Sequence, residues 1–558
     1  MKRKRGLCRP GRASRCRAHC GRSGGVWQVL AWILLVGTGW AGTSGATGQG
    51  TASPETGAFW FATGFEGADE SQSWQGTVRL VPDPAGGCSL EIRRETGDGP
   101  GSTVVTRDLP VAAVRGCLIR AVARVRAEEV SGKPRPWNGI KFMLAIETPR
   151  GRVWPQAELP VGTFPWQRAA FTTRIPSDAT AVRLVLGLEE VTGRVWFDDI
   201  RLAVAAPRRD PPAVRPARPF RGHALSRLRG VMVSPEIDPE GLRVLGQEWG
   251  ANLVRWQLVW RRAPGDRPPL EHYDTWLDAE LRRLDAALPW CERYGLYVVV
   301  DLHSPPGGRA ISGGYVAAND RLFTDPGAQA KLVEVWKKLA RRYRGVRTIW
   351  GFDLVNEPVE EYVAEGCDDW PTLAERVGRA IRGVDPDRTL IVEPAAWGGP
   401  EGFADWVPLR LDRVVYSVHM YQPHAFTHQG VYGEDPPLRY PGTIQGRWWD
   451  KNRLEEALQP VRQFQERYNM HIYAGEFSAI RWAPEGSAHR YLRDLIELFE
   501  LWDWDWSYHA FREWHGWSVE HGEDRSETDP AAGPTDRQRL LRAWFSRNER
   551  PRWQPRTP

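Results

Sequence analysis

Residues 348–358 read TIWGFDLVNEP, and this stretch decides the fold. A mostly apolar run of seven residues stops abruptly on an amide, a carboxylate and a proline. A short apolar run of this kind is typical of a strand that is buried on both faces. Pro358 cannot continue the strand and stiffens the loop that follows. The pattern therefore predicts a buried strand whose C-terminal end carries Asn356 and Glu357.

Seven similar segments accompany this one in the second half of the chain. Together the eight candidate strands cover residues 228–234, 251–259, 296–304, 348–357, 389–395, 413–421, 471–478 and 504–511. Helical patterns, such as 275–295 and 328–345, lie between them. Strand–helix alternation implies parallel strands, and eight units in about 320 residues predict a closed (β/α)8 TIM barrel over residues 223–550. A doubly wound open sheet is the alternative, but no glycine-rich phosphate turn follows any of these strands.

The residues before the barrel follow a different pattern. Short β-rich runs separated by turn residues cover 77–81, 88–94, 102–109, 117–125, 140–146, 166–173, 181–188 and 194–204. This spacing predicts an antiparallel β-sandwich, a jelly roll, over residues 55–205. Residues 206–222 contain five prolines, which predict an extended, semi-rigid linker between the two domains.

The first 46 residues have the composition of a secretory signal. They hold nine Lys or Arg and no acidic residue, followed by the apolar stretch VWQVLAWILLVGTGWAG at 26–42 and by small residues around Ala46. A membrane anchor is the alternative, but the apolar stretch is short and interrupted by glycines. Removing the nine basic residues changes the formal net charge from +6 to −3. We therefore expect a secreted or periplasmic protein with no nucleic-acid partner and no stable membrane association.

Four cysteines follow the leader: Cys88, Cys117, Cys291 and Cys367. Their spacing matches no zinc-binding pattern, and none lies in a motif that would activate a catalytic thiol. Cys88 and Cys117 share the first domain, and a secreted protein permits a disulfide between them. That pairing is an expectation for the structure to test.

Polar residues end most of the barrel strands, and a barrel brings these ends together at one mouth. They include Arg255, Asp301, His303, Asn356, Glu357, Glu393, His419, Tyr421, Glu476 and His509. Glu357 and Glu476 end the fourth and seventh strands, so they are expected to face each other. Two facing carboxylates are what glycosidic bond cleavage needs, because one protonates the leaving oxygen and the other acts at the anomeric carbon. Two ordinary strand-end carboxylates are the alternative, which the arginine, histidine, asparagine and tyrosine at neighbouring ends disfavour.

These residues, in this order, resemble glycoside hydrolase family 5, the cellulase family. The resemblance covers residues 228 to about 547 and rests on Arg255, His303, Asn356-Glu357-Pro358, His419-Met420-Tyr421 and Gly475-Glu476-Phe477. It implies a retaining mechanism with Glu357 as the acid/base and Glu476 as the nucleophile.

The same resemblance implies supporting roles for five further residues. Arg255 and Tyr421 are expected to hydrogen-bond the nucleophile, and Asn356 to bind the sugar 2-hydroxyl. His303 is expected to contact the sugar in the subsite before the cut, and His419 to lie near the acid/base.

Strand eight departs from the family pattern. Members of the family usually place a tryptophan there as the sugar platform, and the aligned position in this chain holds His509. Trp514 or Trp506 is expected to supply the platform instead. Trp397, Trp448, Trp449 and Trp517 are further candidates for stacking on sugar rings, and the long aromatic loop at 422–451 is expected to shape the cleft.

The first domain resembles jelly-roll carbohydrate-binding modules, through Gly64-Phe65-Glu66-Gly67 and Val195-Trp196-Phe197-Asp198-Asp199-Ile200. The resemblance implies a structural calcium ion, with Glu66 and Asp199 as candidate ligands. A sugar-binding face formed by Trp137, Trp154 and Trp166 is one expectation for this domain, and a non-binding spacer sandwich is the other.

The combined prediction is a secreted retaining β-glycoside hydrolase that needs no cofactor for catalysis. Its polysaccharide or oligosaccharide substrate is predicted to be β-1,4-glucan, with mannan, xyloglucan or β-1,3-glucan as alternatives, because loops rather than the fold decide the substrate. Two alternative hypotheses from other functional classes are a metal-dependent barrel hydrolase, suggested by Asp301 and His303, and a non-catalytic polysaccharide-binding protein.

A chain that starts near Gly222 and lacks the first domain is expected to keep its activity on soluble substrate and to lose performance on insoluble polymer.

Overall fold

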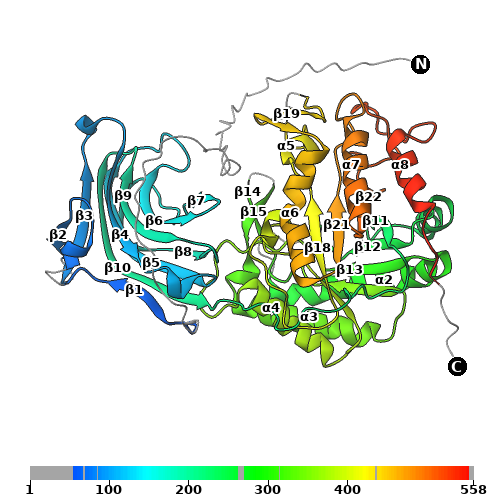
Figure 1. Cartoon of the computed structure of the whole chain (residues 1–558), viewed down its shortest axis with the longest axis horizontal. Helices are drawn as coiled ribbons and strands as arrows, with labels where there is room; N and C mark the ends of the chain where they lie inside the picture. The colour runs from blue at the N-terminus through cyan, green and yellow to red at the C-terminus, as the bar shows by residue number, and fades with distance from the viewer. Residues whose placement is uncertain are drawn as a thin grey trace, which may run out of the picture.

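A computed structural model describes residues 54–66, 70–83, 86–261, 269–312, 315–433 and 437–551. The predicted leader lies outside the described residues. Figure 1 shows two parts side by side: a β-sandwich drawn in blue and cyan, and a barrel drawn in green to red. Within the described residues, no helix is both long enough and apolar enough to cross a bilayer.

The first part consists of two antiparallel sheets, as predicted. One sheet has the order β2-β3-β10-β5-β8, with β1 also paired to β10, and the other has the order β4-β9-β6-β7. The strands are β1 (Phe59–Thr63), β2 (Arg79–Pro82), β3 (Cys88–Arg94), β4 (Ser102–Leu109), β5 (Leu118–Val130), β6 (Gly139–Thr148), β7 (Gly151–Val153), β8 (Gly162–Arg174), β9 (Ala181–Glu189) and β10 (Gly193–Ala206). The jelly-roll strand path itself stays a prediction.

Alternation along β5 shows how the sequence builds this core. Ala121, Ala123 and Val125 are fully buried between the sheets. The residues that alternate with them along the strand, including Arg124 and Arg126, point to the opposite face, because successive side chains of a strand alternate. Arg124 lies over the ring of Trp166 on β8, so this face of the sheet is covered by charged side chains stacked on aromatic rings.

The second part confirms the predicted barrel. Eight strands pair in parallel and close in the order β11-β12-β13-β16-β17-β18-β21-β22. Their bounds are β11 (Arg229–Val233), β12 (Leu253–Gln257), β13 (Tyr297–Asp301), β16 (Ile349–Asp353), β17 (Thr389–Val392), β18 (Val414–Met420), β21 (Ile472–Phe477) and β22 (Asp505–Phe511). The opening segment is therefore the fourth barrel strand, and its five residues are all buried.

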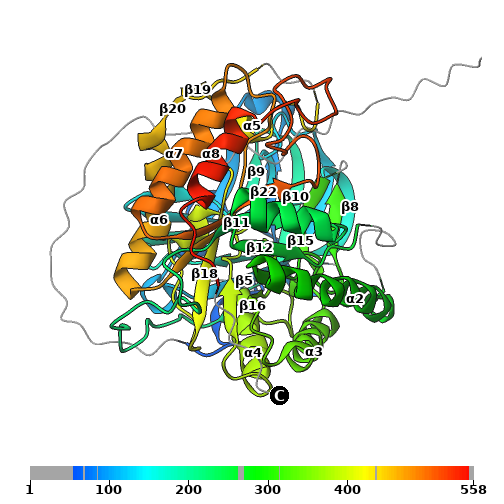
Figure 2. The same cartoon turned by 90° about the vertical axis from the view of Figure 1, so that its right-hand side faces the viewer.

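Helices surround the barrel, as Figure 2 shows from the side away from the sandwich. They are α1 (Pro239–Arg243) with the π-helical turn Val244–Trp249, α2 (Leu270–Tyr294), α3 (Pro326–Tyr343), α4 (Trp370–Arg382), α5 (His424–Thr427), α6 (Lys451–Tyr468), α7 (Ser487–Leu501) and α8 (Asp536–Phe545). Two hairpins, β14 (Arg309–Ser312) with β15 (Tyr315–Asp320) and β19 (Gly442–Ile444) with β20 (Arg447–Trp449), follow strands β13 and β18. Both hairpins extend loops on the C-terminal side of the barrel.

The sandwich contacts the barrel directly. Arg120 Nη2 donates to the backbone oxygens of Val363 (3.0 Å) and Ala364 (2.9 Å), and Arg174 Nη2 lies 2.6 Å from Asp369 Oδ2. Val363, Ala364 and Asp369 belong to the segment that connects Glu357 to α4. The sandwich therefore holds the loop that follows one of the two predicted catalytic glutamates.

The proline-rich linker also lies on the barrel. It forms no strand or helix after Ala206. Pro216 O accepts a hydrogen bond from Asn469 Nδ2 at 2.7 Å, and Arg221 O accepts one from Trp350 Nε1 at 2.8 Å. The segment is extended, as predicted, but these bonds tie it to the barrel surface and make it more than a free spacer.

The four cysteines of the described residues are free thiols. The expected disulfide between Cys88 and Cys117 is therefore wrong. Cys88 begins β3 near the surface, whereas Cys117 is fully buried ahead of β5. Burial also raises the pKa of Cys291 to about 12, which leaves that thiol unreactive.

Candidate active site

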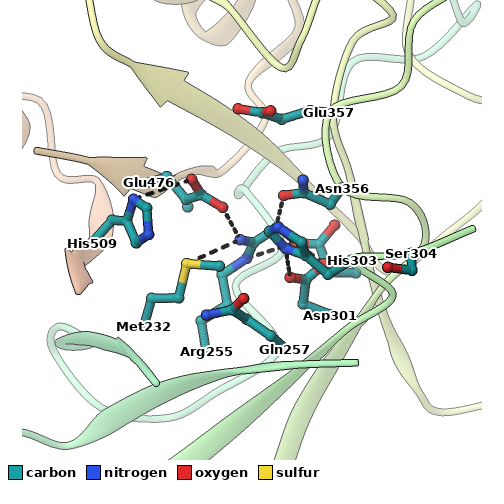
Figure 3. Close-up of polar contacts among 12 residues, drawn as sticks. Met232, Arg255, Gln257, Asp301, His303, Ser304, Asn356, Glu357, Glu476 and His509 are labelled. Carbon is teal, nitrogen blue, oxygen red and sulfur yellow. Dashed lines mark hydrogen bonds and ion pairs between the residues drawn. The ribbon is translucent and has the colours of Figure 1, made fainter. Parts of the chain in front are cut away.

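The predicted polar residues meet at the C-terminal mouth of the barrel (Figure 3). Arg255 is on β12, His419 on β18, Glu476 on β21 and His509 on β22. His303, Asn356, Glu357 and Tyr421 lie in the loops that directly follow β13, β16 and β18. All the barrel residues expected at the site, except the candidate tryptophans, therefore belong to one group of hydrogen bonds and ion pairs.

Arg255 is the central cation of this group and is completely buried. Its Nη1 lies 2.5 Å from Glu476 Oε1, and its Nη2 donates to Asn356 Oδ1 at 3.0 Å. The same nitrogen lies 2.9 Å from Asp353 Oδ2 and 3.1 Å from Glu393 Oε1. One planar guanidinium thus orients the amide and the carboxylates in a fixed geometry.

Glu476 is held as an anion. Arg255 contacts one of its oxygens, and the Tyr421 hydroxyl donates to the other, Oε2, at 2.9 Å. Burial would raise the pKa of Glu476, but the positive charges of His419 and Arg255 outweigh burial and hold this pKa well below its usual range. A buried, ionised carboxylate with both oxygens oriented is suited to act as a nucleophile.

Glu357 has a different environment. Its Oε1 lies 2.9 Å from His419 Nδ1, and its side chain is about one-fifth exposed. One oxygen of Glu357, one oxygen of Glu476 and a ring nitrogen of His419 all lie within 4.8 Å of one another. The two glutamates therefore face each other at close range, with the histidine beside both.

Two groups near Arg255, Asp353 and His419, have pKa values that are shifted toward their protonated forms. Burial raises the pKa of Asp353 well above its usual value, and the neighbouring carboxylates Glu393 and Asp301 add to this although Arg255 opposes it. These effects favour the protonated form of Asp353. Burial alone would lower the pKa of His419, but Glu393 and Glu476 raise it well above its usual value, which favours the protonated ring.

His303 lies at the edge of the group. Its Nδ1 is 2.8 Å from Asp301 Oδ2, and its side chain is one-quarter exposed toward the mouth. Asp301 also lies 3.2 Å from Arg255 Nη2. Asp301 is thus used to orient His303 and to neutralise Arg255, a pattern that does not favour the metal-dependent alternative.

Glu393 is a further site residue, which its position at a strand end in the sequence does not by itself indicate. Its side chain is completely buried at the end of β17. Glu393 Oε2 accepts a hydrogen bond from the backbone N of Glu357 at 2.7 Å, and Oε1 lies 3.0 Å from His419 Nε2. Glu357 has a φ of 45°, a left-handed conformation that is uncommon for a residue with a side chain. Glu393 therefore connects this unusual backbone turn to the cations of the site.

Strand eight corrects one sequence expectation. Trp506 is completely buried, donates to Glu500 Oε1 at 2.8 Å and stacks on Phe545, so it cannot be a sugar platform. Trp514 is 36% exposed in the loop after β22 and packs edge-on against Trp482 and Trp517. Of the two candidates, only Trp514 can reach a ligand.

The long loop after β18 carries exposed aromatic residues beside this mouth. Tyr432 is 56% exposed, and Trp448 in β20 is 60% exposed. His424 and His428 stack on each other with ring centroids 3.8 Å apart, and His428 lies 5.1 Å from the Tyr421 ring. The loop thus extends from the site to the surface, as its length and composition indicate.

The predicted calcium ligands lie in separate surroundings. Asp199 is 3.6 Å from Arg124 and 3.7 Å from Arg201, which already neutralise its charge. Glu66 Oε1 accepts a hydrogen bond from the Cys88 backbone N at 3.4 Å. Within the part of the chain that is described, neither residue joins a cluster of three or more possible ligands. The calcium ion stays a prediction.

The predicted sugar-binding tryptophans of the sandwich differ in exposure. Trp154 is 52% exposed and Trp137 is 40% exposed. Trp166 is partly covered by Arg124, whose guanidinium lies 4.9 Å from the ring centroid. Trp137 and Trp154 are therefore the better candidates for a sugar contact.

A second group of acid and histidine side chains lies at the opposite end of the barrel. Asp505 Oδ2 is 2.8 Å from His223 Nε2 and 2.6 Å from His471 Nε2, and Asp505 Oδ1 accepts from the Leu228 N at 2.7 Å. These bonds satisfy the buried carboxylate without a metal ion. Because His223 follows the linker, the group fastens the linker to the barrel base.

Comparisons with known proteins identify relatives of this chain. Endoglucanase C of Acetivibrio thermocellus is 29% identical over 270 residues, which cover 43% of this chain and 76% of that protein. Cellodextrinase A of Ruminococcus flavefaciens is 26% identical over 256 residues, covering 45% of this chain and 72% of that protein. A solved structure described as a glycoside hydrolase shares 25% identity and covers 57% of this chain and 99% of its own, with a TM-score of 0.46. Residues 227–511 match the family described as Cellulase (glycosyl hydrolase family 5), and the chain therefore belongs to this family of glycoside hydrolases.

Proposed function

We propose that this protein is a secreted, retaining hydrolase of β-linked polysaccharide that acts as an endo-β-1,4-glucanase. The observation that carries the mechanism is the proximity of Glu357 and Glu476, whose nearest oxygens lie within 4.8 Å. Retaining enzymes hold the two carboxyl groups about 5–5.5 Å apart, whereas inverting enzymes need about 6.5–9.5 Å to admit a water molecule. The names of the relatives, an endoglucanase and a cellodextrinase, support β-1,4-glucan as the substrate.

In this proposal Glu476 is the nucleophile and Glu357 the acid/base. Glu476 attacks the anomeric carbon while Glu357 protonates the leaving oxygen, and the sugar becomes covalently attached to Glu476. Glu357, which has given its proton to the leaving oxygen, is then a carboxylate and can accept a proton from the water that attacks the anomeric carbon and releases the sugar from Glu476. The different environments of the two carboxylates suit these different roles.

The surrounding residues position these groups. Arg255 and Tyr421 orient the oxygens of Glu476, and His419 orients Glu357. Asn356, fixed by Arg255, binds the sugar 2-hydroxyl, His303 contacts the sugar before the cut, and Trp514 offers a stacking surface.

Anomeric retention is the first test. Proton NMR of the first product formed from a soluble β-glucan oligosaccharide is expected to show the β-anomer, which later equilibrates. An initial α-anomer would mean that water attacks the anomeric carbon directly.

Reducing-sugar release from β-1,4-glucan, mannan, xyloglucan and β-1,3-glucan distinguishes the alternative substrates. Binding without any release would favour the non-catalytic alternative.

The two glutamates are distinguished by the leaving group. Glu476→Ala is expected to abolish cleavage of every substrate, because no covalent intermediate can form. Glu357→Ala is expected to lower cleavage of polysaccharide by about 10²- to 10⁴-fold or more, the contribution of general acid catalysis. With a 2,4-dinitrophenyl glycoside, the same variant should show a burst, and azide should accelerate its turnover. If azide rescued only Glu476→Ala, the nucleophile and acid/base roles assigned to the two glutamates would be wrong. Circular dichroism checks that both variants are folded.

A further inference from the structure

His509 occupies the strand-eight position where the family resemblance implies a tryptophan. The imidazole lies between two polar groups. Its Nδ1 is 2.6 Å from the Tyr421 hydroxyl, and its Nε2 is 3.4 Å from Glu513 Oε2. The side chain is only 15% exposed. Figure 3 shows the ring pointing toward Glu476, whose Oε2 lies 3.8 Å from Nδ1.

Tyr421 has one hydroxyl proton and two neighbours that could accept it. The hydroxyl is 2.9 Å from Glu476 Oε2 and 2.6 Å from His509 Nδ1. If Nδ1 carries a proton, it donates to the tyrosine oxygen, and the hydroxyl proton must point to Glu476. If Nδ1 is bare, it competes with Glu476 for that proton. The protonation state of His509 therefore determines whether Glu476 receives a hydrogen bond from Tyr421.

Glu513 favours the protonated state. Gln257 Nε2 donates to Glu513 Oε2 at 2.8 Å, and Arg261 Nη2 donates to Oε1 at 3.2 Å, which fixes the carboxylate beside His509. Burial would raise the pKa of Glu513, but the hydrogen bond and charge of His509, followed by the Gln257 hydrogen bond and the charge of His303, lower it to about 2. The Glu513 carboxylate keeps a proton on Nε2 of His509. A neutral ring has only that one proton, so Nδ1 carries a proton as well only when the ring is an imidazolium.

We propose that His509 and Glu513 form a positioning pair that directs the Tyr421 proton to the nucleophile Glu476. The inference rests on the proposed function and deepens it, because it assigns the residue that replaces the tryptophan a role in orienting the nucleophile. The order of contacts is Glu513, His509, Tyr421, Glu476, and each pair of neighbours is within 3.4 Å.

The charged and titratable groups around His509 support this state. They come from several elements: Glu476 from β21, Tyr421 and His428 from β18 and its loop, Glu357 from the loop after β16, His303 from the loop after β13, Arg261 from the loop after β12, and Glu513 from its own loop. Burial would lower the pKa of His509, but Glu513 and Glu476 raise it above the usual value. Burial, followed by the neighbouring His424 and His509, lowers the pKa of His428 well below its usual value, which favours the neutral form of that ring.

The test uses a substrate that does not need the acid Glu357. With 2,4-dinitrophenyl β-cellobioside, the alkaline limb of kcat/KM reports the nucleophile and its partners. Glu513→Gln is expected to move this limb to lower pH by about one unit, because a carboxylate that raises the pKa of His509 has been removed.

Two further variants change the other members of the contact series. His509→Asn keeps a hydrogen-bond donor near Tyr421 but cannot titrate, so its pH profile should lack the alkaline limb. Tyr421→Phe should lower kcat/KM by about tenfold to a hundredfold, the effect of one hydrogen bond to a charged group.

The coupling through Tyr421 separates this role from general stabilisation. In a Tyr421→Phe background, Glu513→Gln should no longer move the limb. Glu520→Gln, a carboxylate in the same segment that pairs with Arg512, is the matched control and should leave the wild-type profile. Identical profiles for wild type and Glu513→Gln, or the same shift without Tyr421, would overturn the proposal.

NMR titration of the His509 ring gives a readout that does not depend on activity. The pKa of the ring should fall in Glu513→Gln, and an unchanged pKa would also overturn the proposal. If the wild-type protein cleaved no β-glycan, the proposed function would fail, whereas this titration would still decide whether the pair exists.

Discussion

At the scale of single residues, the site depends on a buried carboxylate that does not face the substrate. Glu393 Oε2 accepts a hydrogen bond from the Glu357 backbone N, and Oε1 accepts one from Arg255 Nη2 and lies 3.0 Å from His419 Nε2. All three partners are donors, so the position requires a carboxylate rather than an amide. Glu393 thereby couples the conformation of Glu357 to the charge of His419.

Glu393→Gln tests this coupling. The amide has nearly the same shape, but its NH₂ group must face at least one donor, and the lost charge should lower the pKa of His419. We expect kcat/KM on soluble glucan to fall by about tenfold to a hundredfold with KM little changed. Glu401→Gln, in the 3-10 helical turn Pro400–Phe403 that follows the same strand, is the control. Kinetics equal to wild type, with an unshifted His419 titration, would show that Glu393 only fills space.

The sequence predicted the residues that carry chemistry better than those that position them. Arg255, Glu357 and Glu476 could be predicted because barrel strand ends converge and charged residues at buried ends are unusual. The importance of Glu393 depends on three side-chain distances, and that of Glu513 on a loop conformation. Neither is visible in a one-dimensional pattern.

At the scale of elements, all eight barrel strands could be predicted because each is a short apolar run between helical patterns. The hairpins β14–β15 and β19–β20 could not, because their strands are short and carry no repeated apolar side. β7 has three exposed residues and was missed for the same reason. The pairing of Cys88 and Cys117 failed because shared membership of a domain does not determine distance.

Gly230 tests how tightly the barrel strands pack. It lies in β11 opposite Leu253 of β12, and an added Cβ would lie 1.8 Å from the Leu253 backbone oxygen. Backbone in a closed barrel cannot move aside, so Gly230→Ala is expected to destabilise the fold by about 1–3 kcal/mol or more. Calorimetry should show a lower Tm. Gly97→Ala, where a Cβ meets nothing within 4 Å, is the control. An unchanged Tm for Gly230→Ala would mean that the two strands can separate.

At the scale of the whole molecule, the sandwich and the barrel are coupled where the site is built. Arg120 and Arg174 of the sandwich hold residues 363–369, which follow Glu357 and lead into α4. Asp369 is almost completely buried and also accepts from the Thr372 backbone N at the start of α4. The sequence predicted two domains and a linker, but it did not show that the first domain contacts the catalytic loop.

This contact changes what removal of the sandwich should do. A chain starting at Gly222 keeps His223 and its bond to Asp505, so the base of the barrel stays closed. It loses both arginines, which leaves Asp369 without its cation and removes the donors to the backbone oxygens of residues 363 and 364. We now expect kcat/KM to fall on soluble oligosaccharide as well as on insoluble polymer, because the loop after Glu357 loses its support.

Point variants distinguish structural support of the loop after Glu357 from tethering of the enzyme to insoluble polymer. Arg174→Ala in the full chain removes the partner of Asp369 but leaves Trp137 and Trp154 in place, so its loss should be the same on soluble and insoluble substrates. Arg183→Ala breaks an exposed pair with Asp108 on the same sandwich and is the matched control. If the shortened chain keeps full activity on soluble substrate and Arg174→Ala matches the control, the sandwich acts only as a tether. If both lose soluble activity in parallel, the sandwich is part of the catalytic architecture, because a tether raises local concentration only on a surface.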